Sequence, residues 1–181
     1  MKAATLVAAF EIYILKGNSM IRLAKITDVE RMLEIYESAK HFMHTNGNPN
    51  QWNSGYPDRE VLICDIKSNH LYVMQDDYGI IYACFALIGG EDPTYKVIDG
   101  KWHSYAPYGT IHRIAGDGSR RGVFSECTAF ARTIYNHLRV DTHKDNLPMQ
   151  KAVKRDGFEY AGIIYLSDGS PRLAYDWFSA K

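Results

Sequence analysis

Hydrophobic and polar residues alternate along this chain with two different periods. Between Val29 and Met43 the apolar side chains recur every three or four positions, which predicts an amphipathic helix with one face against a sheet. Thr27 and Glu30 have the spacing of a capping box, so we expect this helix to begin there and to end near Thr45. Similar signals predict helices over residues 58–67 and 125–138, and a fourth from a cap at Asp145 or Asn146 to Gly157.

Shorter apolar runs bounded by turn residues predict the strands. They cover residues 21–24, 71–75, 80–88, 108–115, 140–142, 158–166 and 173–178. Residues 91–104 read as a polar excursion, and residues 51–57 as an aromatic loop that is too polar for a core. Helices and strands alternate without an internal repeat or a low-complexity linker, so we expect an α/β (α+β) fold in which helices flank one sheet.

The first 19 residues stand apart from this pattern. The apolar stretch from Ala3 to Phe10 is interrupted at Glu11, and no small-residue cleavage site follows it, so we do not expect a signal peptide. The sequence from Met20 reads like a fresh start, because strand and helix signals follow at once. We therefore expect an N-terminal extension over residues 1–19, either an upstream start or an extra packing element, and one domain over residues 20–181.

Composition narrows the classes of function. The chain has 181 residues, of which 46% are hydrophobic and 23% charged, which suits one globular domain. Its formal net charge is +0 at pH 7, so no positive field favours nucleic acid, and no apolar stretch reaches the roughly 20 residues of a membrane span. Cys64, Cys84 and Cys127 lack the spacing of a disulfide framework or a zinc site. We expect a cytoplasmic protein without a nucleic-acid, membrane or metal partner.

A turn rich in glycine and arginine separates the strand that ends at Ala115 from the helix that follows. It reads Gly116-Asp117-Gly118-Ser119-Arg120-Arg121-Gly122. A helix that starts after such a turn offers free backbone N–H groups and a positive dipole end to an anion, and arginines add charge-assisted hydrogen bonds. Phosphate binding and a solvated loop with surface arginines fit this segment about equally well. The glycine spacing matches neither a P-loop nor a dinucleotide-binding fingerprint.

Three patterns follow one another between residues 21 and 178. Ile111-His112-Arg113-Ile114-Ala115 is a strand that leads into Ser119-Arg120-Arg121-Gly122-Val123-Phe124. Asn146-Leu147-Pro148-Met149 and Lys154-Arg155-Asp156-Gly157-Phe158 bracket the last predicted helix. In this order they resemble the fourth strand, the pyrophosphate loop and the fourth helix of the GNAT superfamily of acyl-CoA-dependent N-acetyltransferases. Residues 139–146 and 168–172 resemble a group of bacterial members.

The resemblance implies a mixed, mostly antiparallel, twisted sheet of about seven strands flanked by about four helices. It implies transfer of an acetyl or other acyl group from acetyl-CoA to a primary amine of a small molecule or a protein, by direct attack in a ternary complex. The implied cofactor-binding residues are Ile114, Ala115, Gly116, Ser119, Arg120, Arg121, Gly122, Val123, Phe124 and Asn146. The chain departs from the family pattern at Ser119, at Phe124 and at Val153, where many members have a tyrosine as general acid.

Several residues are candidates for the chemistry. His112 is our first candidate for the general base, because it lies on the strand beside the implied thioester position and an imidazole titrates near neutral pH. A histidine satisfied within the sheet is the alternative. Tyr160 and Tyr165 are candidates for the missing acid, or else buried tyrosines with satisfied hydroxyls. Trp52 and Tyr56 lie in a loop that borders the acceptor site in GNAT folds, either as an aromatic wall for the substrate or as a hydrophobic lid.

Two other functions are compatible with these residues. A non-catalytic CoA-binding or regulatory module would account for Phe124 and Val153, and a nucleotide-binding domain would use the same anion site. A homodimer also fits such a fold, because sheet edges or helices often pair between copies.

Overall fold

The computed structural model describes residues 13–15, 19–52 and 55–179. The strands in this part of the chain are β1 (Tyr13–Leu15), β2 (Ser19–Leu23), β3 (Leu71–Gln75), β4 (Ile81–Gly89), β5 (Asp99–Gly100), β6 (Gly109–Gly116), β7 (His137–Thr142), β8 (Glu159–Tyr165) and β9 (Pro171–Phe178). The α-helices are α1 (Val29–Thr45), α2 (Arg59–Lys67), α3 (Val123–Ile134) and α4 (Leu147–Arg155). Two short 3-10 helices are η1 (Ile26–Asp28) and η2 (Pro93–Tyr95).

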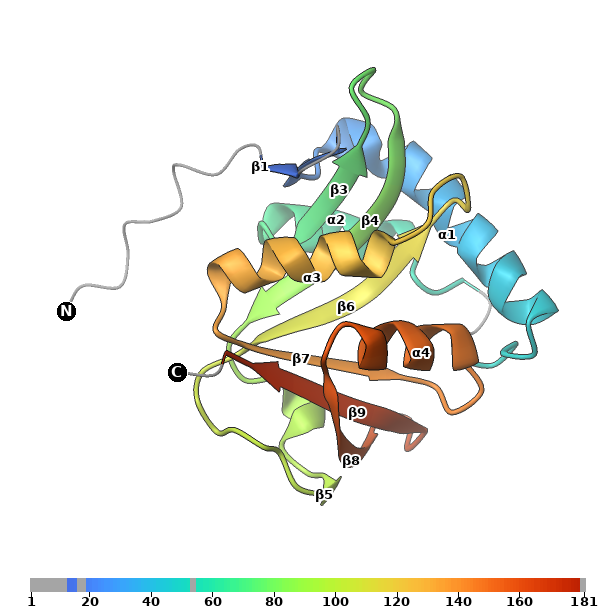
Figure 1. Cartoon of the computed structure of the whole chain (residues 1–181). Coiled ribbons are helices and arrows are strands. Elements are labelled where there is room, and N and C mark those ends of the chain that lie inside the picture. Colours follow the sequence, from blue (N-terminus) through green and yellow to red (C-terminus); the bar gives the residue numbers. More distant parts are fainter. Residues whose placement is uncertain (1–12, 16–18, 53–54, 180–181) are drawn as a thin grey trace.

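The strands form one sheet in the order β1-β2-β3-β4-β6-β7-β9-β8-β5 (Figure 1). Neighbouring strands run antiparallel except β6 and β7, which are parallel. The mixed, mostly antiparallel sheet with four helices is therefore confirmed. The seven predicted strands are all present, and the sheet gains β1 and β5, which have three and two residues and are too short to show a hydrophobic pattern.

Helices cover both faces of the sheet. α1 and α2 lie on one face, and α3 and α4 on the other (Figure 1). Met32, Ile35 and Leu62 are fully buried in the first interface, and Cys127 and Val153 in the second. Burial of side chains this size stabilises the fold by about 1.5–3 kcal/mol each. The two cores pack against opposite faces of the sheet and bury Ile111 and Ala115 of β6, the strand on which the candidate site lies.

Residues 91–104 are not the polar excursion that their composition predicts. They contain η2 and β5 and bury Tyr95 and Trp102 against Ala161, Ile164 and Ala174 of β8 and β9. The two rings stack with their centroids 5.4 Å apart. A segment with two large rings among charged residues shows no periodicity, so the pattern concealed this third core.

The capping box predicted at Thr27 and Glu30 does not form, although α1 begins and ends where expected. η1 precedes the helix, and the Asp28 carboxylate accepts a hydrogen bond of 2.7 Å from the Lys25 N–H. Glu30 instead forms an ion pair of 2.6 Å with Arg59 of α2. The Asp28 carboxylate, accepting from the N–H of the η1 N-cap residue Lys25, thus takes the role that the spacing assigned to Glu30.

The other helix starts are closer to expectation. Asn146, one of the two predicted caps, caps α4 through its side chain, and Asp58, the first residue of the second predicted helix, caps α2 in the same way. α3 begins two residues earlier than predicted, directly after Gly122, and ends at Ile134, earlier than the predicted Leu138. It ends early because Leu138 already lies in β7, where the sheet buries it completely.

Two features of β6 open the sheet. Its pairing with β4 is irregular between Cys84 and Ala86, and Arg113 on the opposite strand has a φ of 52°, which is a bulge. β6 pairs with β7 only from Gly109 to Ile111. Past Ile111 the two parallel strands diverge, and no strand of the described residues lies beside the last residues of β6 on that side. The sheet therefore has a gap between the ends of β6 and β7.

Part of the predicted N-terminal extension, residues 1–12 and 16–18, lies outside the described residues. Residues 13–15 form β1, which pairs with β2 at the edge of the sheet. In the portion of the chain that the structure describes, no helix combines the length and the apolar character needed to cross a membrane.

Candidate active site

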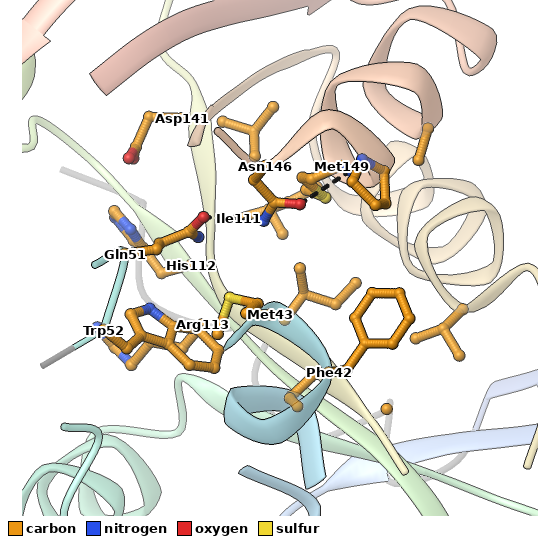
Figure 2. A pocket seen from close by; sticks show the side chains of 18 of the residues that line it. Phe42, Met43, Gln51, Trp52, Ile111, His112, Arg113, Asp141, Asn146 and Met149 are labelled. Carbon is orange, nitrogen blue, oxygen red and sulfur yellow. Dashed lines mark hydrogen bonds between the residues drawn. The ribbon is translucent and has the colours of Figure 1, made fainter. Parts of the chain in front are cut away.

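A cavity of about 1220 Å³ occupies the gap between β6 and β7. One half is lined by β6, the start of α3 and α4, and the other by the end of α1, the loop after it, the segment before β5 and the turn between β8 and β9. Figure 2 shows Phe42 and Met43 of α1 facing Asn146 and Met149 of α4 across this cavity. Phe42 belongs to the predicted apolar face of α1 but is 53% exposed, because that end of the helix lines the cavity.

The start of α3 forms one mouth of the cavity. Gly122, at the N-cap, has a φ of 85° and offers no side chain to accept from the first amides of the helix. Arg120, Arg121 and Arg155 also line this mouth. Arg120 lies over the Tyr82 ring at 4.5 Å and 3.8 Å from Asp76, while Arg121 is exposed. The helix start, with its positive dipole end, and three guanidinium groups, of which Arg155 lies 3.5 Å from Asp156, are features that favour an anion at this mouth.

Most of the predicted cofactor residues come together around this mouth and the gap. The cavity is lined by Ile114, Ala115, Gly116, Arg120, Arg121, Gly122, Val123 and Asn146. The side chain of Asn146 caps α4 through its Oδ1 and donates from its Nδ2 to the Oε1 of Gln51 at 2.8 Å. The cap that the sequence predicts is therefore confirmed.

Ser119 and Phe124 do not line the cavity. The hydroxyl and the amide of Ser119 both donate to Oδ1 of Asp117, at 2.6 and 2.9 Å, so this residue stabilises the turn itself. Phe124 is buried in the core on the α3 face, with its ring 5.8 Å from that of Phe158. A large residue fits at this position because its side chain turns into the core, away from the cavity.

His112 lies on β6, and its imidazole contacts Asp92 in the segment before β5. We call this half of the cavity, which includes the loop after α1, the acceptor half. The Nε2 of His112 is 2.9 Å from Oδ2 of Asp92, whose other oxygen accepts from the N–H and the hydroxyl of Thr94. Burial alone would raise the pKa of Asp92, but the hydrogen bonds from His112 and Thr94 outweigh it and lower that pKa to about 2. The carboxylate is thus ionised at neutral pH, so Nε2–H donates to it and Nδ1 is left to accept a proton.

This contact predicts an acid-sensitive contribution to stability. The pKa of Asp92 is about 2 in the folded protein against an ordinary value of 3.8, so its stabilising effect is complete above pH 4 and is lost as the pH falls toward 2. The difference in unfolding free energy between the wild type and Asp92→Asn should shrink by about 1 kcal/mol from pH 5 to pH 3. Urea unfolding at both pH values measures it, and a difference that does not change with pH would contradict the ionised pair.

Aromatic and charged side chains complete the acceptor half. Trp52 packs edge-on against Tyr36 and Tyr56, with ring centroids 5.6 and 6.5 Å away. Arg113 pairs with Asp65 at 2.6 Å and donates to the Tyr56 hydroxyl at 3.2 Å. Trp52 and Tyr56 both line the cavity, so the structure brings these two predicted substrate residues to the same half as His112.

Tyr160 and Tyr165 are not brought to the cavity. Both lie on β8, which the strand order separates from the gap by β9. Tyr160 is 49% exposed and packs on Tyr175, while the Tyr165 hydroxyl donates to Asp99 at 2.6 Å. Placing β8 beside β7 would have put these hydroxyls near the gap, but β9 takes that position.

Gln51 lines the cavity but was not predicted as a site residue. Gln51 joins the loop after α1 to the other half of the site, since its carbonyl accepts from Arg172 at 3.1 Å and its Oε1 from Asn146. Asp141, at the end of β7, accepts a hydrogen bond of 2.6 Å from the buried Tyr95 hydroxyl. These partners are between 46 and 121 residues apart, so no local pattern reveals them. Among the described residues, no group of three His, Cys, Asp or Glu side chains is placed to hold a metal ion.

Comparison with solved structures identifies the family, whereas no protein-family model and no curated protein matches the chain. An acetyltransferase of the GNAT family from Streptococcus agalactiae is 30% identical, with a TM-score of 0.81 over 94% of this chain and 99% of that one. One from Listeria monocytogenes has the same fold at 15% identity, with a TM-score of 0.69 over 93% and 99%. An acetyltransferase from Salmonella typhimurium that modifies the N-terminal serine of a ribosomal protein has it at 14% identity, with a TM-score of 0.65 over 94% and 100%. The similarity to the streptococcal protein extends over nearly the whole of both chains, and the chain belongs to the GNAT family of acetyltransferases, which are acyl-CoA-dependent N-acyltransferases.

Proposed function

We propose that this protein transfers the acetyl group of acetyl-CoA to a primary amine by direct attack in a ternary complex. The observation that carries the proposal is one continuous cavity between β6 and β7. Arginines and the start of α3 lie at one mouth, and His112, paired with Asp92, lies in the other half. Family membership favours this function over a non-catalytic CoA-binding module and over a nucleotide-binding domain.

The residues around the gap fit coenzyme A. The amides that open α3, together with Arg120, Arg121 and Arg155, would hold its diphosphate. The last residues of β6 pair with β4 on one side but not with β7 past Ile111, so on the β7 side they offer backbone groups to the amides of the pantetheine arm. Acetyl-CoA supplies an acetyl thioester: the nitrogen of the neutral amine bonds to the acetyl carbon as the carbon–sulfur bond breaks. The proton that this nitrogen loses as the amide forms balances the one that the released thiolate takes up, and the earlier proton of the ammonium form leaves through the base.

His112 is the residue we assign to proton removal. An alkyl amine is mostly protonated at neutral pH, so it must lose a proton before it can attack. His112 lines the cavity, and Asp92 fixes the proton on its Nε2, which leaves Nδ1 as the basic nitrogen. Asp92 is a positioning residue here, comparable to the acid that orients a histidine in a catalytic triad. We propose no protein acid for the leaving thiolate, because a thiol leaves with moderate help from water.

Trp52 and Tyr56 would form the wall against which the acceptor lies. Their rings pack edge to face at 69° beside Arg113 and line that side of the cavity. Small molecules and protein N-termini are both candidate acceptors, since a neighbour of the same fold modifies the N-terminal serine of a ribosomal protein.

Isothermal titration with acetyl-CoA tests the proposal. We expect saturable binding by the folded wild type and a Kd about tenfold higher for Arg121→Ala, because one charge-assisted contact is lost. Arg59→Ala, an exposed arginine outside the cavity, is the matched control and should bind like the wild type. Absence of saturable binding up to about 1 mM ligand would remove the proposal. Turnover is best followed by mass spectrometry of the acetylated amine, because the exposed Cys64 thiol would react with thiol-detecting reagents.

A further inference from the structure

Arg172 is a buried cation without a buried anion beside it. Its exposed fraction is 6%, and it lines the acceptor half of the cavity at the start of β9. Its hydrogen bonds go to neutral oxygens: the hydroxyl of Ser170 at 3.2 Å and the carbonyls of Pro171 and Gln51 at 2.9 and 3.1 Å. No carboxylate of the described residues lies within ion-pair distance of it, although burying an unpaired charge is costly.

The other charged side chains of this half already have partners. Asp92 pairs with His112 at 2.9 Å, and Arg113 pairs with Asp65 at 2.6 Å. Asp141 accepts from Tyr95, and Asp168 is an exposed residue whose carboxylate caps the turn through the Ser170 N–H. Among the described residues that line this half, Asp141 and Asp168 have hydrogen-bond partners but no cation within ion-pair distance, and Arg172 is therefore the cation without an ion-pair partner.

The charge of Arg172 is felt by its neighbours. Burial, and then the positive charge of Arg172, lowers the pKa of His143. Three hydrogen bonds to the described residues also leave two of the five N–H groups of a guanidinium without an acceptor in that part of the chain. A planar guanidinium with donors to spare is suited to a carboxylate.

The position of Arg172 separates this anion from coenzyme A. Arg172 donates a hydrogen bond to the carbonyl of Gln51, which directly precedes Trp52 in the loop after α1. The phosphates of coenzyme A would lie at the start of α3, where Arg120, Arg121 and Arg155 supply the charge. A second anionic group in the same cavity must therefore belong to the other substrate.

We propose that the acceptor is an amine that carries a carboxylate, such as an amino acid, and that Arg172 binds this carboxylate while the amine lies toward His112. The inference rests on the proposed acetyl transfer and adds the class of acceptor to it. No covalent step beyond that transfer is involved.

The test compares matched acceptors. The twenty common amino acids are assayed beside their carboxamides, and kcat/KM is measured for each pair with the wild type, Arg172→Gln and the control Arg59→Gln. The wild type should acetylate at least one amino acid, and its preference for the carboxylate over the carboxamide should fall by about tenfold or more in Arg172→Gln, mainly through KM. The preference should not change in Arg59→Gln.

Arg172 also donates a hydrogen bond to the Gln51 carbonyl in the loop after α1. This structural role must be distinguished from recognition of the substrate carboxylate. Loss of the loop contact would lower kcat/KM for both members of a pair, whereas loss of recognition lowers it for the carboxylate alone. Arg172→Lys keeps the charge and should retain part of the preference. An equal effect of Arg172→Gln on both members, or failure of the wild type to acetylate any carboxylate-bearing amine, would overturn the inference. Titration of the same samples with acetyl-CoA separates the two failures. Saturable binding keeps the proposed acetyl transfer and rejects only the acceptor class, whereas absence of binding rejects both.

Discussion

Replacing Gly122 with valine should weaken acetyl-CoA binding by about ten- to hundredfold. Gly122 is the N-cap of α3 and has a φ of 85°, a conformation that a β-branched residue adopts only at a cost of about 1–3 kcal/mol. The turn will relax to relieve this strain, and the relaxation moves the amides that open the helix. Those amides hold the diphosphate in our proposal, so the loss of affinity follows from the loss of their alignment. Isothermal titration measures it directly.

Gly79 provides a matched control for this substitution. It has a φ of 78° and lies in the turn between β3 and β4, and an added Cβ would meet no atom within 4 Å at either glycine. Gly79→Val therefore introduces the same backbone strain outside the cavity lining, in a turn that touches the site only through the 3.8 Å contact between Asp76 and Arg120. We expect both variants to lose similar stability in urea, whereas only Gly122→Val should lose affinity. Equal affinities for acetyl-CoA in the two variants would mean that the start of α3 does not hold the cofactor.

Replacing His112 with glutamine should lower kcat by about 10²–10⁴ without changing the affinity for acetyl-CoA. The imidazole lies in the acceptor half, away from the mouth with the arginines, so it should contribute to proton removal and not to cofactor binding. Asp92→Asn should lower kcat less, because it removes the group that orients the imidazole and leaves the imidazole in place. Steady-state kinetics with a saturating amine measure both effects.

The exposed His41 of α1 is the control for His112, because it lies outside the main cavity. His41→Gln should have wild-type kinetics. A His112→Gln enzyme with normal kcat would leave His112 with only the structural role in the sheet.

The cofactor half of the site could be predicted because it is nearly continuous in sequence. The strand, the glycine turn and the start of α3 occupy residues 109–124, and local chemistry alone indicates an anion site at such a junction. The end of α1 and the cap of α4 were also predictable, since turn residues and caps act within a few positions. Ser119 and Phe124 show the limit of this approach, because a spacing motif does not say which side chains turn toward the core.

Of the acceptor half, His112, Trp52 and Tyr56 could be predicted, but the rest could not, because it is assembled from segments that meet only in the folded chain. Gln51 contacts Asn146 and Arg172 at separations of 95 and 121 residues. Tyr160 and Tyr165 failed as candidates for a related reason: a hairpin pattern predicts β8 and β9 but does not say which of them lies beside β7. Asp92 and Tyr95, hidden in an apparently polar segment, depend on a third core that has no periodic signal.

The central claim is that coenzyme A lies between β6 and β7, with its diphosphate on the first amides of α3. A crystal structure of the protein with coenzyme A tests this most directly. We expect the diphosphate within hydrogen-bond distance of the amides after Gly122, Arg121 beside it, and the pantetheine arm along β6 past Ile111. Coenzyme A found anywhere else on the protein, with the space between the two strands still free of ligand, would contradict the account.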